Sequence, residues 1–144
     1  MNKLWIITFC IALVIPVFSI SCASSVSTAG PISISCDDFQ NQASITKDVQ
    51  LITGNTLTVA LCSNRTTGFS WSEKAQISNP QVVEQTGYKW VSPEDTGKVG
   101  VPGTEEFMFK ALQPGNSVIT FGYSRPWEGG EKNMQTVILN VTVK

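Results

Sequence analysis

The feature that most restricts the fold of this chain is a regular alternation of apolar and polar residues in its C-terminal half. In residues 105–112, Phe107 and Phe109 fall on one face of an extended chain. The same period recurs in residues 117–123 and 134–143. A period of two is that of a β-strand with one buried face, so all three stretches are predicted to be strands of a sheet that covers a core.

Shorter stretches of the same kind come earlier in the chain and are separated by turn residues such as Gly54-Asn55. The strands predicted there are residues 49–53, 56–62, 69–71 and 82–90, the last weakened by Gly87. Trp71 and Trp90 are predicted to lie in the core. No window after the N-terminal segment shows sustained helical periodicity. The whole pattern predicts an all-β fold, an immunoglobulin-like antiparallel β-sandwich of about seven or eight strands.

The N-terminal segment has the pattern of a secretory signal. Lys3 provides a positive charge, and residues 4–18 are almost wholly apolar but too few to span a membrane comfortably. Residues 1–21 are therefore interpreted as a signal peptide, residues 22–31 as a linker, and residues 32–144 as the folded domain. We expect the protein to be exported, which means secreted, periplasmic or at the cell surface.

Cys22 stands where a bacterial lipoprotein would carry its lipid, between Ser21 and Ala23. Lipidation of Cys22 and simple cleavage nearby are both consistent with this pattern, and a lipid on Cys22 would be the only link to a membrane. Cys36 and Cys62 remain in the predicted domain. In an oxidising compartment they are predicted to form a disulfide that contributes roughly 3 kcal/mol, with two buried free thiols as the alternative.

The chain contains no histidine. This excludes a Ser-His-Asp triad, a Cys-His pair and any zinc site with a histidine ligand, and we expect neither a metal nor a cofactor. The net charge of −1 argues against a nucleic-acid partner, and there is no basic run to bind an anionic membrane surface. Glu105 and Glu106 are candidates for acid–base catalysis, but neighbouring strand residues point to opposite faces, so we do not expect an enzyme.

Three connections between predicted strands look unlike ordinary turns. They are residues 64–69 (the first loop), residues 92–104 (the second loop) and residues 125–133 (the third loop). Alternate loops of a β-sandwich gather at one end, so we expect these three to lie together.

The motifs in these loops resemble those of the chagasin family of cysteine protease inhibitors. The first loop matches the family's Asn-Pro-Thr-Thr-Gly-Phe motif except that Arg65 replaces the proline, and the third carries its Arg-Pro-Trp motif intact. The second keeps the outer glycines of the family's Gly-X-Gly-Gly motif. The resemblance assigns protease binding to Asn64, Arg65, Thr66, Thr67, Gly68, Phe69, Gly100, Val101, Pro102, Gly103, Arg125, Pro126 and Trp127.

This resemblance implies a reversible, monomeric inhibitor of papain-like cysteine proteases that occludes the active-site cleft with three loops. Thr66 and Thr67 would cover the catalytic Cys-His pair and offer their hydroxyl groups to the enzyme. Trp127 would stack on an aromatic wall of the primed side, and the second loop would lie along the non-primed side. Gly68 is expected to adopt a positive φ, and Arg65 to add charge and freedom to its loop.

The alternative function is an exported adhesion or carbohydrate-binding module. Tyr88, Trp90 and Trp127 could then form an aromatic platform for a sugar. Inhibition of papain at a one-to-one ratio would distinguish the inhibitor from such a module.

Overall fold

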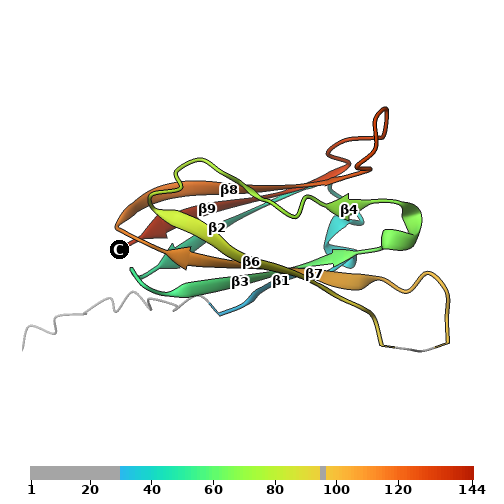
Figure 1. The fold of residues 1–144 in the computed structure, drawn as a ribbon, viewed down its shortest axis with the longest axis horizontal. Coiled ribbons are helices and arrows are strands. Elements are labelled where there is room, and N and C mark those ends of the chain that lie inside the picture. The colour runs from blue at the N-terminus through green and yellow to red at the C-terminus, as the bar shows by residue number, and fades with distance from the viewer. Residues whose placement is uncertain (1–29, 95–96) are drawn as a thin grey trace, which may run out of the picture.

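A computed structural model describes residues 30–94 and 97–144, which form two β-sheets packed face to face (Figure 1). The predicted signal peptide and Cys22 lie outside the described residues. Within this described part, no helix has the length and apolar character needed to cross a membrane. The all-β sandwich predicted from the alternating pattern is confirmed.

One sheet has the strand order β1-β3-β7-β6 and the other the order β2-β9-β8-β4, with β5 paired to β8. The strands of the first sheet are β1 (Ile32–Ile34), β3 (Thr56–Ser63), β6 (Val83–Val91) and β7 (Gly103–Ala111). Those of the second are β2 (Ser44–Leu51), β4 (Ser70–Trp71), β5 (Gln76–Ile77), β8 (Gly115–Ser124) and β9 (Gln135–Val143). Two short 3-10 helices, η1 (Asp37–Phe39) and η2 (Arg65–Thr67), complete the described elements.

Aromatic side chains from both sheets fill the space between them. Phe107 of β7 and Phe121 of β8 meet edge to face with ring centroids 4.9 Å apart, and Phe109 contacts the same Phe121 ring. All three are completely buried. Burying a side chain of this size contributes roughly 1.5–3 kcal/mol, so the alternating pattern of these strands is also a main source of stability.

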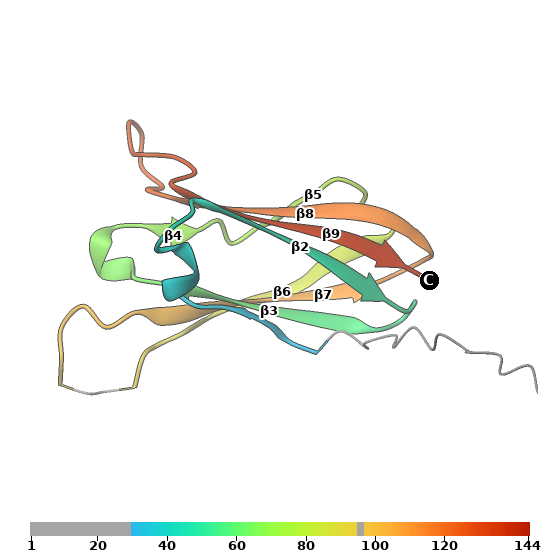
Figure 2. The same cartoon turned by 180° about the vertical axis from the view of Figure 1, so that it is seen from behind.

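The prediction of wholly antiparallel sheets is wrong at the N-terminal end of the domain. β1 pairs in parallel with β3, and β2 pairs in parallel with β9. The chain passes from one sheet to the other through η1 between these two strands (Figure 2). Each N-terminal strand therefore joins the edge of a sheet far from its sequence neighbour, where no hairpin imposes an antiparallel direction.

Strand β2 starts at Ser44, earlier than the predicted strand over residues 49–53. Ile45 and Val49 are both buried, but the position between them on the same face is held by the exposed Lys47. This interruption hides the first half of the strand from a search for alternation. The two-residue strand β5 was not predicted.

The predicted disulfide is present between Cys36 and Cys62, whose Cα atoms are 5.3 Å apart. Cys36 follows β1, and Cys62 lies in β3 just before the first loop. The bond therefore ties the start of the domain to the strand that supports this loop.

The pairing of the strands brings the ends of the three loops together at one end of the sandwich, opposite the C-terminus (Figure 1). Ser63, the last residue of β3, is paired with Gly103, the first residue of β7. Ser70 of β4 is paired with Ser124, the last residue of β8. The first loop therefore starts beside the end of the second loop and ends beside the start of the third loop.

Candidate functional site

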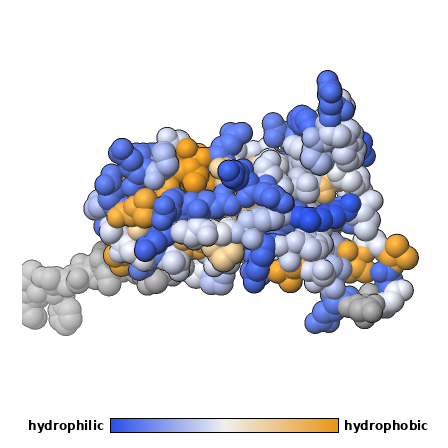
Figure 3. All heavy atoms as spheres, in the orientation of Figure 1, coloured by the Kyte–Doolittle hydropathy of each residue, from blue (hydrophilic) through white to orange (hydrophobic). Residues whose placement is uncertain are grey.

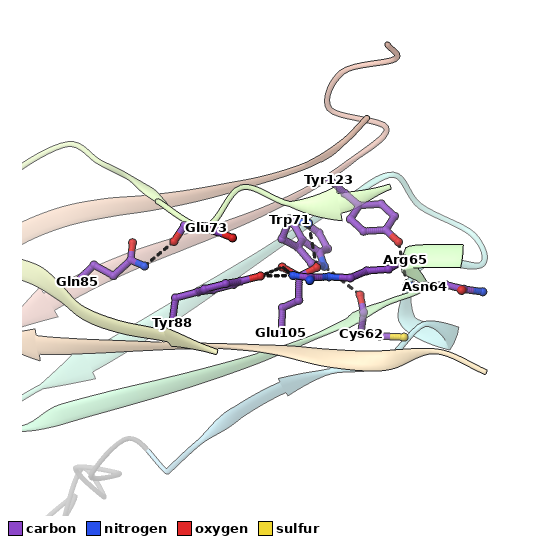
Figure 4. Close-up of polar contacts among 9 residues, drawn as sticks. All are labelled: Cys62, Asn64, Arg65, Trp71, Glu73, Gln85, Tyr88, Glu105 and Tyr123. Carbon is purple, nitrogen blue, oxygen red and sulfur yellow. Dashed lines mark hydrogen bonds and ion pairs between the residues drawn. The ribbon is translucent and has the colours of Figure 1, made fainter. Parts of the chain in front are cut away.

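The first loop is a tight 3-10 turn organised by Asn64. The Asn64 side chain accepts hydrogen bonds from the backbone N–H and the hydroxyl of Thr66, at 3.3 and 2.6 Å. The Asn64 carbonyl accepts from the hydroxyl of Thr67 at 2.7 Å. The Asn64 N–H donates to the Tyr123 hydroxyl at 2.9 Å (Figure 4). Asn64 thus acts as the cap of η2, a role for which asparagine is well suited.

These contacts differ from what the resemblance implied for the two threonines. Both side chains are exposed at the tip, but both hydroxyl protons are donated within the loop. Only the lone pairs of the two oxygens remain to accept hydrogen bonds, and the Thr67 oxygen already accepts weakly from the N–H of Phe69 at 3.5 Å. The threonines therefore stiffen the tip more than they offer donors to a partner.

Gly68 ends the turn with φ = +80°, as predicted. It is also where the first and third loops meet, because a Cβ atom at this position would lie 2.6 Å from the ring of Trp127. Trp127 is 52% exposed, so one part of its ring packs on Gly68 while the rest faces solvent. Glycine is needed here for both the backbone angle and the close approach.

Arg125 joins the third loop to the first through its guanidinium group. Its guanidinium lies 4.5 Å from the ring centre of Phe69 and 5.8 Å from that of Trp127. Its backbone N–H donates to the Glu131 carbonyl at 2.8 Å, and Lys132 donates to the carbonyls of Arg125 and Trp127. The resemblance assigned Arg125 to protease binding, and in the structure its guanidinium packs against rings of the first and third loops.

The second loop is attached to the first by the Asn64 side-chain amide, which donates to the carbonyl of Gly100 at 3.0 Å. Gly100 has φ = +82°, and its neighbour Val99 is 99% exposed. Apolar atoms gather on this loop in the space-filling view (Figure 3). At the base of the loop, a Cβ atom on Gly103 would lie 2.5 Å from the ring of Trp90, so the ring lies directly on the glycine.

Beneath the loops lies a polar cluster that the sequence analysis did not assign to the site. Glu105 is completely buried and accepts hydrogen bonds from the Tyr88 hydroxyl at 2.7 Å and from the backbone N–H of Trp71 at 3.2 Å (Figure 4). The sequence did contain a sign of this cluster, because Glu105 falls on the same face of the predicted strand as Phe107 and Phe109, the face toward the core. A charged residue at an inward position needs partners.

Tyr88 and Trp90 reach this cluster because β6 contains a bulge between Gln85 and Gly87. The extra residue shifts the phase of the strand, so Tyr88 and Trp90 face inward after it. The prediction that Trp90 lies in the core is correct only in part, since Trp90 is half-buried at the open, loop-bearing end. Trp71 is fully in the core, as predicted.

Arg65 is the residue for which the expectation was wrong. Its side chain is not free but turns back under the loop toward the cluster. It forms an ion pair with Glu105 at 3.5 Å, donates a hydrogen bond to the Tyr88 hydroxyl, and lies 4.5 Å from the ring centre of Trp90. The positive charge of Arg65 is therefore paired with a carboxylate of the same protein.

The two adjacent carboxylates of β7 do not share a site. Glu106 lies on the outer face and forms an ion pair with Lys89 at 2.9 Å, while Glu105 is buried on the inner face. The proposed aromatic platform is not formed either. The Arg65 guanidinium covers a face of the Trp90 ring. The Trp127 ring packs on Gly68 of the first loop instead.

Replacing Gly68 with alanine is expected to reduce the free energy of unfolding by about 1–2 kcal/mol because of the left-handed backbone, with a further loss from the Trp127 ring. Gly54→Ala is the matched control, since Gly54 has φ = +89° but open space at its Cβ position. Urea unfolding of both variants measures the difference. Equal losses in the two variants would contradict close packing of Trp127 on Gly68.

Burial, together with the hydrogen bond to Glu105, raises the pKa of Tyr88 above the ordinary tyrosine value of 10.0. The folded state then holds the phenol neutral at a pH where the unfolded chain ionises it. This contribution to stability is complete below about pH 10 and is lost as the pH rises further. We expect the free energy of unfolding to fall more steeply between about pH 10 and 12 for the wild type than for Tyr88→Phe. Parallel curves would show that Tyr88 is not held neutral.

Together, the fold and the loops define a β-sandwich protein in which the first loop contacts both the second and the third at one end of the sandwich. Comparison with known proteins gives this protein a family. The family model described as "Chagasin family peptidase inhibitor I42" matches residues 50–141, and the chain belongs to this family. Its members are peptidase inhibitors and not enzymes.

Individual proteins agree with this assignment. The chain is 29% identical to Amoebiasin-2 of Entamoeba histolytica over 86 residues, which cover 60% of this chain and 68% of that protein. It is 35% identical to Chagasin of Trypanosoma cruzi over 85 residues, or 53% of this chain and 77% of that protein. The solved structure of PbICP-C in complex with falcipain-2 has the same fold, with a TM-score of 0.57 and 23% identity over 78% of this chain and 99% of that chain.

Proposed function

We propose that this protein is a reversible inhibitor of papain-like cysteine proteases that fills the active-site cleft with its three loops. The observation that carries the proposal is the connection between the loops. Asn64 is hydrogen-bonded to Gly100 of the second loop, and Gly68 packs on Trp127 of the third. A surface held in this way loses little conformational freedom on docking, which favours tight binding.

The comparisons support the choice of target class. The family consists of peptidase inhibitors, and the similar protein PbICP-C was solved in complex with falcipain-2. In this proposal the tip formed by Thr66 and Thr67 covers the catalytic cysteine of the enzyme. The backbone of residues 100–103 runs along one side of the cleft, and Trp127 contacts the other side.

The shape of the first loop explains how such a tip would resist cleavage. The chain enters η2 at Asn64 and leaves it at Gly68, so it is not extended as a protease substrate must be. The N–H groups of Thr67 and Gly68 are bonded to the Asn64 and Arg65 carbonyls within the turn. With these donors engaged within the turn, the tip cannot pair with the enzyme as an extended peptide strand does.

Titration of papain with the purified protein tests the proposal. We expect activity to fall linearly and to vanish near a one-to-one ratio, to return on dilution, and the inhibitor to remain uncut. A serine protease serves as the control and should keep its activity. Full papain activity in an excess of the folded protein would refute the proposal and favour a binding module of another kind.

We also propose that the protein is exported. The support is the signal-like pattern of residues 1–21 and the Cys36–Cys62 disulfide, a bond typical of oxidising compartments. Mass spectrometry of the N-terminal peptide from native cells would distinguish a lipid on Cys22 from simple cleavage. A peptide that begins at Met1 would contradict export by a cleaved signal.

A further inference from the structure

The most unusual feature of the loop-bearing end is the direction of the Arg65 side chain. Arg65 lies in the exposed tip, yet its guanidinium turns inward to the buried Glu105 (Figure 4). The Arg65 side chain is 40% exposed, and that of Glu105 is not exposed at all. An ion pair between a loop tip and a buried carboxylate fixes the loop more firmly than a pair between two exposed side chains would.

Glu105 is itself held in place by the rest of the fold. It accepts from the backbone N–H of Trp71 in β4 and from the hydroxyl of Tyr88 in β6, and it lies in β7. Its position is therefore set by strands of both sheets. The guanidinium of Arg65 supplies a positive charge beside this buried carboxylate, which would otherwise be costly to bury.

Arg65 also links the first loop to the second. Its guanidinium lies over one part of the Trp90 ring system, and Trp90 packs on Gly103 at the base of the second loop. A hydrogen bond from Asn64 to Gly100 also links these loops. Arg65 thus contributes to the spacing of two of the three surfaces that would enter the protease.

We propose that Arg65 is a positioning residue, which holds the first loop in its inhibitory conformation through Glu105 and Trp90 rather than by contacting the protease. The inference rests on the proposed function and assigns a role to the residue at which this chain departs from the motif it otherwise resembles. In this chain the contacts of the Arg65 side chain restrict the first loop, whereas a proline would restrict it by fixing the backbone angle φ.

The backbone at this position allows a direct test of the idea. Arg65 is the first residue of η2, where proline is well tolerated, and the preceding Asn64 has φ = −110° and ψ = 87°, outside the helical region that proline disfavours. Arg65→Pro would therefore stiffen the loop without any of the contacts of the arginine side chain. Arg65→Ala would have neither the contacts of the arginine side chain nor the restricted backbone of a proline.

The experiment compares wild type, Arg65→Ala and Arg65→Pro for inhibition of papain and for hydrogen exchange of the Thr67 and Gly68 amides. We expect Arg65→Ala to raise the inhibition constant about tenfold and to speed exchange at both amides, because the loop must be ordered on binding. Arg65→Pro should restore most of the inhibition and most of the protection of the two amides. Lys89→Ala is the control. It breaks the ion pair with Glu106 on the outer face of β6 and β7, the strands that carry Tyr88 and Glu105, and should change neither inhibition nor exchange.

Two results would overturn the inference. One is an Arg65→Ala variant with unchanged inhibition and exchange. The other is an Arg65→Pro variant that protects the amides but inhibits as weakly as Arg65→Ala, because Arg65 would then contact the enzyme directly. If Arg65→Ala does not fold, Arg65→Ala/Glu105→Gln removes both charges and should give the same tenfold loss. If the wild type leaves papain active, the proposed function fails, while amide exchange still decides whether Arg65 holds the loop.

Discussion

Replacing Trp127 with alanine is expected to weaken the inhibition of papain about 30-fold. Truncating a central aromatic residue of an interface typically costs about 2 kcal/mol of binding free energy, and 1.4 kcal/mol corresponds to a factor of ten. Trp127 has the properties of such a residue, since it is large, 52% exposed and held in place by contacts with Gly68 and Arg125. The inhibition constants of the two proteins measure the loss.

The fold should be unaffected by this change, because Trp127 lies outside the core. We expect the melting temperature of Trp127→Ala to stay within about 2 °C of the wild type. Ile52→Ala is the matched control, since Ile52 is 47% exposed and follows β2 at the opposite end of the sandwich. Unchanged inhibition by Trp127→Ala, or an equal loss in Ile52→Ala, would remove the third loop from the proposed binding surface.

The second large effect concerns stability. Replacing both Cys36 and Cys62 with alanine should reduce the free energy of unfolding by about 3 kcal/mol, because the disulfide closes a loop with a sequence separation of 26 residues. For a domain of this size the melting temperature should fall by roughly 12 °C. Calorimetry of the oxidised wild type and the double variant measures the difference.

The reduced wild-type protein is the control for this variant and should melt near the same lower temperature. Inhibition at room temperature should be nearly unchanged, because Asn64 and its hydrogen bonds, rather than the disulfide, shape the first loop. A loss of inhibition without a loss of stability would show instead that the disulfide orders the loop.

The sequence alone was sufficient to predict those features that depend on local periodicity and on short motifs. The alternation around Phe107 and Phe109 predicted strands, because a β-strand turns successive side chains to opposite faces whatever its partner is. The positive φ of Gly68 could be predicted for a similar reason, since only the local backbone sets it. The three motifs, in order, were sufficient to predict the family.

Only the tertiary structure decided which side chains meet. Arg65 and Glu105 are 40 positions apart in the numbering, and nothing local in either segment says that β3 and β7 bring them within 3.5 Å. The parallel pairing of β2 with β9 and the packing of Trp127 on Gly68 are decided in the same way. Such contacts depend on the free energy of the whole packed sandwich, whereas strand periodicity and the backbone of a single glycine do not.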